Sequence, residues 1–208
     1  MKIVVITDEP MKAELLAQGL KGDVYVEWQT IPEPVEGAAA YIDLLFTPSS
    51  GRIHTLKALQ PALIIINSVS GTLEDLPGGF IRMNGWNSFL KRPVAEAACT
   101  DFKIRPAAET MFSCFSKKTE WTPDIPGFIS VRVVSMIINE AYFALEEGVS
   151  TKEEIDTAMK LGTHYPYGPF EWGQIIGLSK LNERLTKLAG KNSRYSPATL
   201  LQQEANTR

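Results

Sequence analysis

Short apolar runs separated by Gly, Pro, Asp and Ser dominate the first part of the chain, up to about residue 124. These runs have the length and the Val, Ile and Leu content of buried strands. Between several of them lie segments with helical spacing, such as 11–20, where Leu15, Leu16 and Leu20 share one side. Strands that alternate with helices predict an α/β domain with a parallel sheet. The predicted strands are 2–7, 24–27, 43–46, 62–66, 80–83, 94–98 and 120–122, and the predicted helices are 11–20, 51–60 and 106–115.

The pattern becomes helical after a Pro-rich junction at 123–127. Apolar residues recur at near-helical spacing from Ile129 to a stop signal at 146–148. Thr151 and Glu154 fit a capping box that opens the next helix. Further helices are predicted at 169–176, from 179 onward, and from Ser196-Pro197 to the end of the sequence. We therefore expect two domains, an α/β domain at 1–124 and an all-helical domain at 125–208.

The turn after the first predicted strand lacks the glycines of a dinucleotide-binding fold. Such a turn needs glycine so that the backbone can approach a pyrophosphate at a helix N-terminus. Here no glycine occurs before Gly19, and Asp8 and Glu9 place negative charge where the pyrophosphate would lie. Acidic residues at this place complement the helix dipole, which is the reading we favour. The α/β domain therefore resembles an abbreviated Rossmann-like domain with a degenerate NAD site.

Composition excludes several classes of protein. The 208 residues are 44% hydrophobic and 22% charged, as in a globular protein, and the net charge of −3 argues against a nucleic-acid partner. No run reaches the ~18 consecutive apolar residues of a membrane span, and no signal peptide is evident. Cys99 and Cys114 are expected to be free thiols, and His54 and His164 have no partners for a metal site. We expect a cytoplasmic protein without a membrane or metal role.

Several linked blocks in the second half carry a family resemblance. They are residues 126–129 (PGFI), 138–141 (INEA), 154–162 (EIDTAMKLG), 165–172 (YPYGPFEW) and 194–201 (RYSPATLL). In order and spacing they resemble the C-terminal helical domain of the 3-hydroxyacyl-CoA dehydrogenases. The resemblance implies that residues 1–124 are a degenerate Rossmann-like domain and that 125–208 are the helical domain through which the family dimerises. An apolar stripe that includes Val133 and Ile137 fits a homodimer contact.

The resemblance extends to candidate catalytic residues in the first half. Residues 84–93 (NGWNSFLKRP) resemble the segment that carries the family's catalytic histidine, whose place is taken by Asn84. Glu96 falls at the position of the glutamate that orients this histidine. Ser68 and Ser70 flank Val69, which stands where family members place a substrate-side serine. The catalytic asparagine of the helical domain is replaced by Val131.

The loss of the glycine turn and of the histidine resembles the second, degenerate module of two-module 3-hydroxyacyl-CoA dehydrogenases. An asparagine amide cannot titrate near neutral pH, so it cannot replace the general base. Our first hypothesis is therefore a pseudoenzyme of fatty-acid or acyl-CoA metabolism with lost or much reduced NAD-dependent oxidation of 3-hydroxyacyl-CoA. It would act as a dimerising or accessory module, beside a catalytically complete homologue.

Two alternatives stay open. One is an active NAD-dependent 3-hydroxyacyl-CoA (3-hydroxybutyryl-CoA) dehydrogenase with a rearranged site around Glu96, Ser68 and Ser70, which the retention of Glu96 favours. The other is a module that binds acyl-CoA without redox activity. The family implies NAD as the cofactor, whereas the missing glycine turn argues against its binding here.

Overall fold

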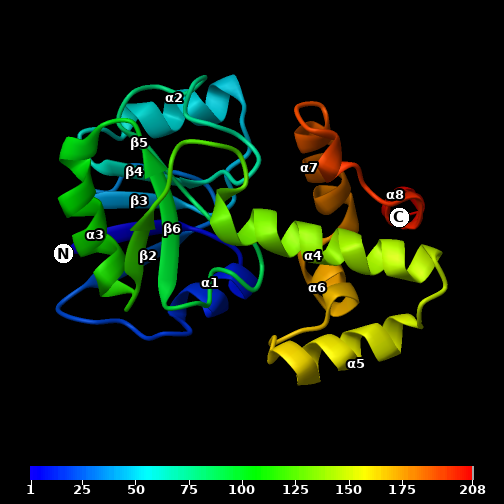
Figure 1. Ribbon diagram of the computed structural model, residues 1–208. Helices are drawn as coiled ribbons and strands as arrows, with labels where there is room; N and C mark the ends of the chain where they lie inside the picture. Colours follow the sequence, from blue (N-terminus) through cyan, green and yellow to red (C-terminus); the bar gives the residue numbers. More distant parts are fainter. Residues whose placement is uncertain (208) are drawn as a thin grey trace. The chain divides into compact units, whose positions relative to one another are not determined.

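Within residues 1–207, which the computed structural model describes, a seven-stranded sheet organises the N-terminal part of the chain (Figure 1). The strand order is β2-β1-β3-β4-β5-β6-β7, and all neighbours are parallel except β5 and β6. Residues 84–93 join β5 to β6 without a helix, and so short a connection cannot cross over to a parallel neighbour. The predicted parallel sheet is thus confirmed except for this pair. The strands are β1 (Lys2–Ile6), β2 (Tyr25–Gln29), β3 (Ala40–Asp43), β4 (Leu63–Asn67), β5 (Phe80–Met83), β6 (Val94–Cys99) and β7 (Lys118–Trp121).

Helices cover both faces of this sheet. On one face, α1 (Glu9–Leu16) and α3 (Arg105–Cys114) bury Leu15 and Phe112 in a core with β1, β3 and β6. On the opposite face, α2 (Ser50–Ala58) buries Leu56 against β1, β3 and β4, as the separation of α2 from α1 in Figure 1 also shows. Strands buried on both sides explain the continuous apolar runs of the sequence.

The connection from β2 to β3 makes the Rossmann-like domain an abbreviated one. Residues 30–39 form no helix, and Val35 and Ala38 pack against the core that α2 also covers. A loop therefore takes the place of a crossover helix on this side of the sheet. The loop at 30–39 runs back over one face of the sheet, so that β3 starts at the same end of the sheet as β1 and is parallel to it.

Several element boundaries differ from the sequence prediction, and two of these differences in the first unit have a clear physical reason. The strand predicted at 43–46 lies at Ala40–Asp43, because this stretch forms the ladder with β1 and β4, while Leu44 and Phe46 are buried beyond it. The first helix starts at Glu9, before the predicted residue 11, because Pro10 suits a first helical turn.

The chain separates into two compact units, Met1–Phe128 and Ile129–Arg208. A short 3₁₀ helix, η1 (Phe102–Ile104), precedes α3 in the first unit. The elements from the junction onward are helical, and the capping box at Thr151 and Glu154 is present. These elements are α4 (Phe128–Glu146), α5 (Lys152–Thr163), α6 (Pro169–Ile176), α7 (Leu178–Ala189), the 3₁₀ helix η2 (Ser193–Tyr195) and α8 (Thr199–Asn206).

Asp156 of α5 explains the YPYGP block that precedes α6. Its buried carboxylate accepts hydrogen bonds from the backbone N–H groups of Phe170 (2.8 Å) and Glu171 (3.1 Å), so a side chain from another helix caps α6. A Cβ on Gly168 would lie 2.3 Å from the Asp156 carboxyl group, so only glycine fits. The block is therefore a packing motif that joins α5 to α6.

Asn139 gives the long helix α4 a polar role inside the second unit. Its amide donates to the Ser196 carbonyl and accepts from the Ala198 N–H, both at 2.9 Å. These bonds hold residues 196–198 in an extended conformation, so α8 starts at Thr199 and not at the predicted Ser196-Pro197.

By length and composition alone, α4 could cross a membrane, with a mean hydropathy of 1.5 over an 18-residue window. Of that window, 44% is buried inside the structure. A single helix of this kind is weak evidence for a membrane span, because the core helix of a soluble unit has the same composition.

Candidate functional site

Polar residues gather at the carboxyl ends of the parallel strands in the first unit. This edge is where open α/β sheets bind ligands, because helix N-termini and loops converge there. Asp8 follows β1, Asp43 ends β3, Asn67 ends β4 and Asn84 follows β5. Because β6 runs antiparallel to β5, its Glu96 also lies near this edge.

Asp8 closes the N-terminus of α1 with the chain's own carboxylate. Its side chain accepts a hydrogen bond from the Met11 N–H at 2.9 Å, and its carbonyl accepts from the Lys12 N–H at 3.0 Å. Pro10 has no N–H to offer. The Met11 N–H, one of the donors that a pyrophosphate could use, is thus already bonded, and the Glu9 side chain adds a second negative charge in the first turn. The residues of this turn do not fit the pyrophosphate of NAD.

A cavity of about 430 Å³ lies beside this turn, at the ends of β1 and β2. Lys12 stands over the Trp28 ring, 5.0 Å from its centroid, and pairs with Glu9 at 3.3 Å. The ring is therefore already covered by a cation of the same chain. The cavity walls are supplied by Thr7, Glu9, Lys12, Trp28, Gln29, Thr30, Ile31 and Glu33.

The structure brings Asn84 and Glu96 together. The Asn84 side-chain amide donates to a Glu96 carboxylate oxygen at 2.8 Å, and both residues are buried. The Asn84 amide oxygen accepts from the Trp86 N–H at 3.3 Å. The pair has the hydrogen-bonded arrangement expected of an acid–base dyad, but its first member has no titratable group near neutral pH.

Ser68 and Ser70 are half-buried in the loop that follows β4. In the sheet, β4 lies next to β5. A Cβ on Gly71 would lie 2.9 Å from the Ser68 hydroxyl oxygen, so this hydroxyl is turned toward its own loop. Val69 between them is buried, and its carbonyl accepts from the Gly127 N–H at 2.8 Å. The loop is thus held by its backbone, and the serine side chains are not part of that attachment.

An ion pair that the sequence analysis missed fixes this loop. Arg82 of β5 is fully buried, pairs with Asp124, and donates from Nε to the Ser68 carbonyl at 2.8 Å. Asp124 also accepts from the Leu73 N–H at 2.7 Å. Burial lowers the pKa of Arg82, and the Asp124 carboxylate opposes that shift. The only signal in the sequence is a lone arginine in an apolar strand, which indicates a buried ion pair but not its partner.

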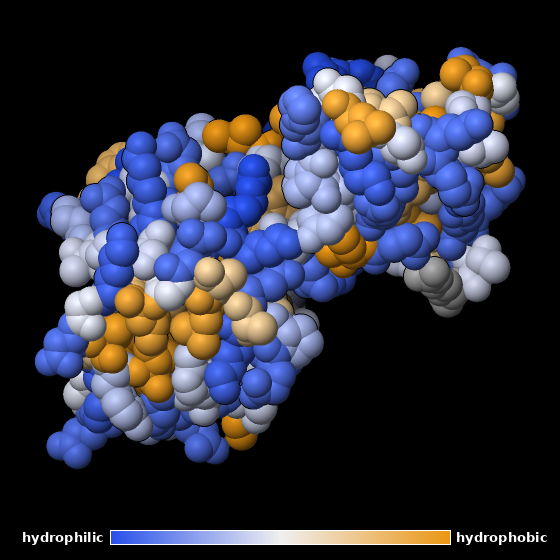
Figure 2. Space-filling view, turned by 90° about the horizontal axis from the view of Figure 1, so that it is seen from below, coloured by the Kyte–Doolittle hydropathy of each residue, from blue (hydrophilic) through white to orange (hydrophobic). Residues whose placement is uncertain are grey.

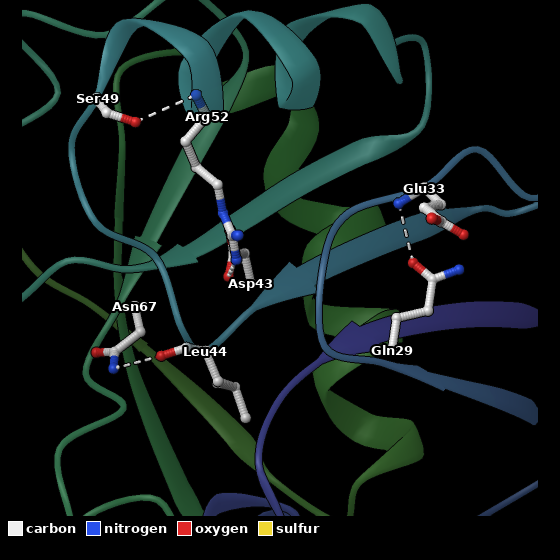
Figure 3. Close-up of polar contacts among 7 residues, drawn as sticks. All are labelled: Gln29, Glu33, Asp43, Leu44, Ser49, Arg52 and Asn67. Atoms are coloured by element: carbon white, nitrogen blue, oxygen red, sulfur yellow. Dashed lines mark hydrogen bonds and ion pairs between the residues drawn. The ribbon is translucent and has the colours of Figure 1, made fainter.

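Two further polar anchors at the strand ends also escaped the sequence analysis (Figure 3). The Asp43 carboxylate, which is fully buried, receives two hydrogen bonds of 2.7 Å from the Arg52 guanidinium of α2. Burial raises the pKa of Asp43, and Arg52 counters part of this rise. Asn67 donates to the Leu44 carbonyl at 3.1 Å and accepts from the Gly85 N–H at 3.0 Å. These contacts tie the ends of β3, β4 and β5 together.

Glu14 and Lys117 hold the segment that follows Asn84. The Glu14 carboxylate accepts from the Ser88 N–H at 2.9 Å, which fixes Ser88 at a positive φ of 72°. The Lys117 ammonium donates to the carbonyls of Leu90 and Arg92. Burial lowers the pKa of Lys117 to about 8, although the Glu14 charge acts in the opposite direction.

In the second unit, Val131 is fully buried in α4 and carries no functional group. No group of three or more His, Cys, Asp or Glu side chains that could hold a metal ion occurs in the part of the chain described by the structure. Of the candidate catalytic residues that the sequence suggested, Asn84, Glu96, Ser68 and Ser70 therefore all belong to the first unit.

Comparison with known proteins assigns the family. Residues 127–207 match the model of the 3-hydroxyacyl-CoA dehydrogenase C-terminal domain. The chain is 32% identical over 166 residues to a 3-hydroxybutyryl-CoA dehydrogenase of Bradyrhizobium diazoefficiens, a match that covers 71% of this chain and 55% of that protein. Residues 127–207 belong to the 3-hydroxyacyl-CoA dehydrogenase family. This oxidoreductase family is the one that the helical blocks resemble, so that prediction is confirmed.

Other relatives define the extent of the similarity. The 3-hydroxyadipyl-CoA dehydrogenase of Escherichia coli (strain K12) is 46% identical over 84 residues, which is 39% of this chain and 18% of that protein. A crystal structure of (S)-3-hydroxybutyryl-CoA dehydrogenase from Ralstonia eutropha has a TM-score of 0.77 at 18% identity, covering 97% of this chain and 92% of that one. The latter likeness confirms the Rossmann-like fold. The chain spans about half the length, or less, of the curated relatives it matches.

The buried Lys117 predicts a pH dependence of stability. Its pKa is 10.5 when unperturbed and about 8 in the folded chain, so between these values the unfolded chain holds a proton that the folded chain has released. The stabilisation is present above the upper pKa and is lost as the pH falls through about 8. Relative to Lys117→Met, the free energy of unfolding of the wild type should rise by on the order of 3 kcal/mol from about pH 7 to pH 10.5.

Urea unfolding followed by circular dichroism at each pH measures this difference. Lys118→Met is the matched control, because Lys118 is the exposed neighbour, and its difference from wild type should change little with pH. A flat difference for Lys117→Met across the same range would contradict a buried ammonium at this position.

Proposed function

We propose that this chain is a degenerate 3-hydroxyacyl-CoA dehydrogenase module whose NAD-dependent oxidation is lost or much reduced, and that it acts as a dimerising or accessory module. The observation that carries this proposal is the Asp8 carboxylate bound at the N-terminus of α1. Since that carboxylate takes the Met11 N–H and places negative charge where a pyrophosphate would lie, the cofactor expected of the family has no anchoring turn.

The Asn84–Glu96 pair supports the same proposal. In oxidation of a 3-hydroxy group, a base must take the hydroxyl proton as hydride leaves. The group that faces this role here is an amide whose N–H already donates to Glu96. A missing general base typically costs about 10²- to 10⁴-fold in rate. The two deficiencies are independent, and restoring one leaves the other in place.

The partial coverage of longer relatives supports an accessory role. Only 18% of the Escherichia coli 3-hydroxyadipyl-CoA dehydrogenase is matched, at 46% identity. Such a match fits a chain that corresponds to one module of a longer enzyme, and a catalytically complete homologue is then the natural partner.

A turnover assay tests the loss of activity. With NAD⁺ and 3-hydroxybutyryl-CoA, the absorbance of NADH should stay at background for the wild-type chain. Asn84→His should also stay at background, because it restores the base position but leaves Asp8 in place at the α1 terminus. A complete dehydrogenase of the family serves as the positive control.

Wild-type turnover that disappears in Glu96→Gln would contradict the proposal and establish the active dehydrogenase instead. Saturable binding of acetoacetyl-CoA without any turnover would favour the module that binds acyl-CoA. Turnover and binding measurements on the same purified proteins thus distinguish the two alternatives.

An apolar stripe along α4 supports homodimerisation. Ile129 and Val133 are 55% and 54% exposed, Met136 and Ile137 are partly exposed, and their spacing places them along one side of the helix. Most of the surface visible in Figure 2 is hydrophilic, with hydrophobic residues gathered in separate groups. Exposed apolar side chains in a row are typical of a protein–protein contact.

Val133→Glu should therefore weaken the dimer by about tenfold or more, because it places a charge at the centre of the contact. Sedimentation velocity over a range of chain concentrations measures the effect. Val149→Glu is the matched control, because Val149 is 69% exposed but lies beyond α4. A wild-type chain that stays monomeric at all concentrations would contradict self-association, and a complex formed only with a complete homologue would assign the stripe to that partner.

A further inference from the structure

Positive charge is concentrated in one segment of the second unit. Residues 180–194 contain five cationic side chains and one carboxylate, Glu183, although the whole chain has a net charge of −3. Glu183 is already paired with Lys187 at 2.6 Å. The cationic residues are Lys180, Arg184, Lys187, Lys191 and Arg194.

Guanidinium groups from different elements meet at Tyr195, at the end of this segment. Arg132 of α4 donates from Nη2 to the Tyr195 hydroxyl at 3.0 Å. Arg194 of η2 lies with its Cζ 4.9 Å from the centroid of the same ring, and the Arg132 Cζ lies 5.4 Å from it. Both guanidinium groups therefore lie beside the Tyr195 side chain, although they carry the same charge.

A third guanidinium acts on the same group. Arg184 of α7 is fully buried. The pKa of Tyr195 is lowered, chiefly by the hydrogen bond from Arg132 and then by the charges of Arg132, Arg194 and Arg184. The positive potential at the phenol therefore comes from three elements of the fold.

Arg132 and Arg194 keep most of their hydrogen-bonding capacity. Within residues 1–207, no ion pair joins either of them to a carboxylate. Each guanidinium has five N–H donors in a planar fork, of which Arg132 uses one on Tyr195. The Tyr195 hydroxyl can also donate, because its own proton is not used in accepting from Arg132.

We propose that Arg132, Arg194 and Tyr195 form a binding site for the phosphate group of a small molecule. Guanidinium forks match the geometry of phosphate oxygens, and a dianion suits two positive charges better than a single carboxylate does. The cluster is too small, and the chain too acidic, to hold a nucleic acid. The proposal does not depend on the proposed function, because no residue of the strand edge takes part.

Calorimetric titration of the full chain at constant ionic strength tests the site. The probes are inorganic phosphate, adenosine 3′,5′-bisphosphate and coenzyme A. At least one should bind saturably, and Arg194→Gln should weaken that binding by about tenfold, the effect of losing one charge-assisted hydrogen-bond partner. Phosphate alone would identify a free anion as the ligand, whereas binding restricted to the larger probes would identify a phosphate ester.

Lys187→Gln is the matched control, because it removes the same charge from the same segment but breaks only the pair with Glu183. It should change the affinity less than about twofold, as expected of an exposed charge outside the site. Arg132→Gln provides a second variant should Arg194→Gln alter the fold. Absence of saturable binding for all three probes, or equal weakening by Lys187→Gln and the site variants, would overturn the proposal.

Discussion

The hydrogen bond from the Met11 N–H to the Asp8 carboxylate places a negative charge of the chain itself at the N-terminus of α1. A helix N-terminus offers few free donors, and an anion placed there is stabilised by those donors and by the helix dipole. In this chain the anion is a side chain of the turn itself. With Pro10 next to it and Glu9 in the first turn, the strand edge keeps the topology of a nucleotide-binding fold without its anion site.

The Asn84–Glu96 pair has the hydrogen-bonded geometry of a dyad, although its first member is an amide. The two side chains are buried and hydrogen-bonded at 2.8 Å, and Asn67, Glu14 and Lys117 hold the surrounding segments in place. Such a polar cluster is stable when each member has a partner, and an amide satisfies Glu96 as well as an imidazole would. The hydrogen bond from Asn84 is therefore sufficient to stabilise the buried Glu96 carboxylate. The presence of Glu96 alone does not imply catalysis.

The sequence predicted the fold well because its signals were local. Apolar runs marked the buried strands, and the Thr151 capping box marked α5. The pairing of Asn84 with Glu96 followed from a family resemblance. Contacts between distant residues could not be predicted: Arg82 with Asp124, and Arg132 with Tyr195, lie 42 and 63 residues apart. A single charged residue in an apolar segment does not reveal which distant residue it contacts. The strand at Ala40–Asp43 was misplaced because the apolar run continues past the end of the ladder to Phe46.

Calorimetric titration of the purified chain with NADH tests the central claim most directly, since it measures cofactor binding without any requirement for turnover. A complete dehydrogenase of the family, titrated in the same buffer, shows the signal of an intact site. No saturable heat is expected for this chain up to about 1 mM NADH, so any binding would be weaker than about −4 kcal/mol. Saturable binding at micromolar NADH would contradict it, because the Asp8 carboxylate would then not exclude the cofactor.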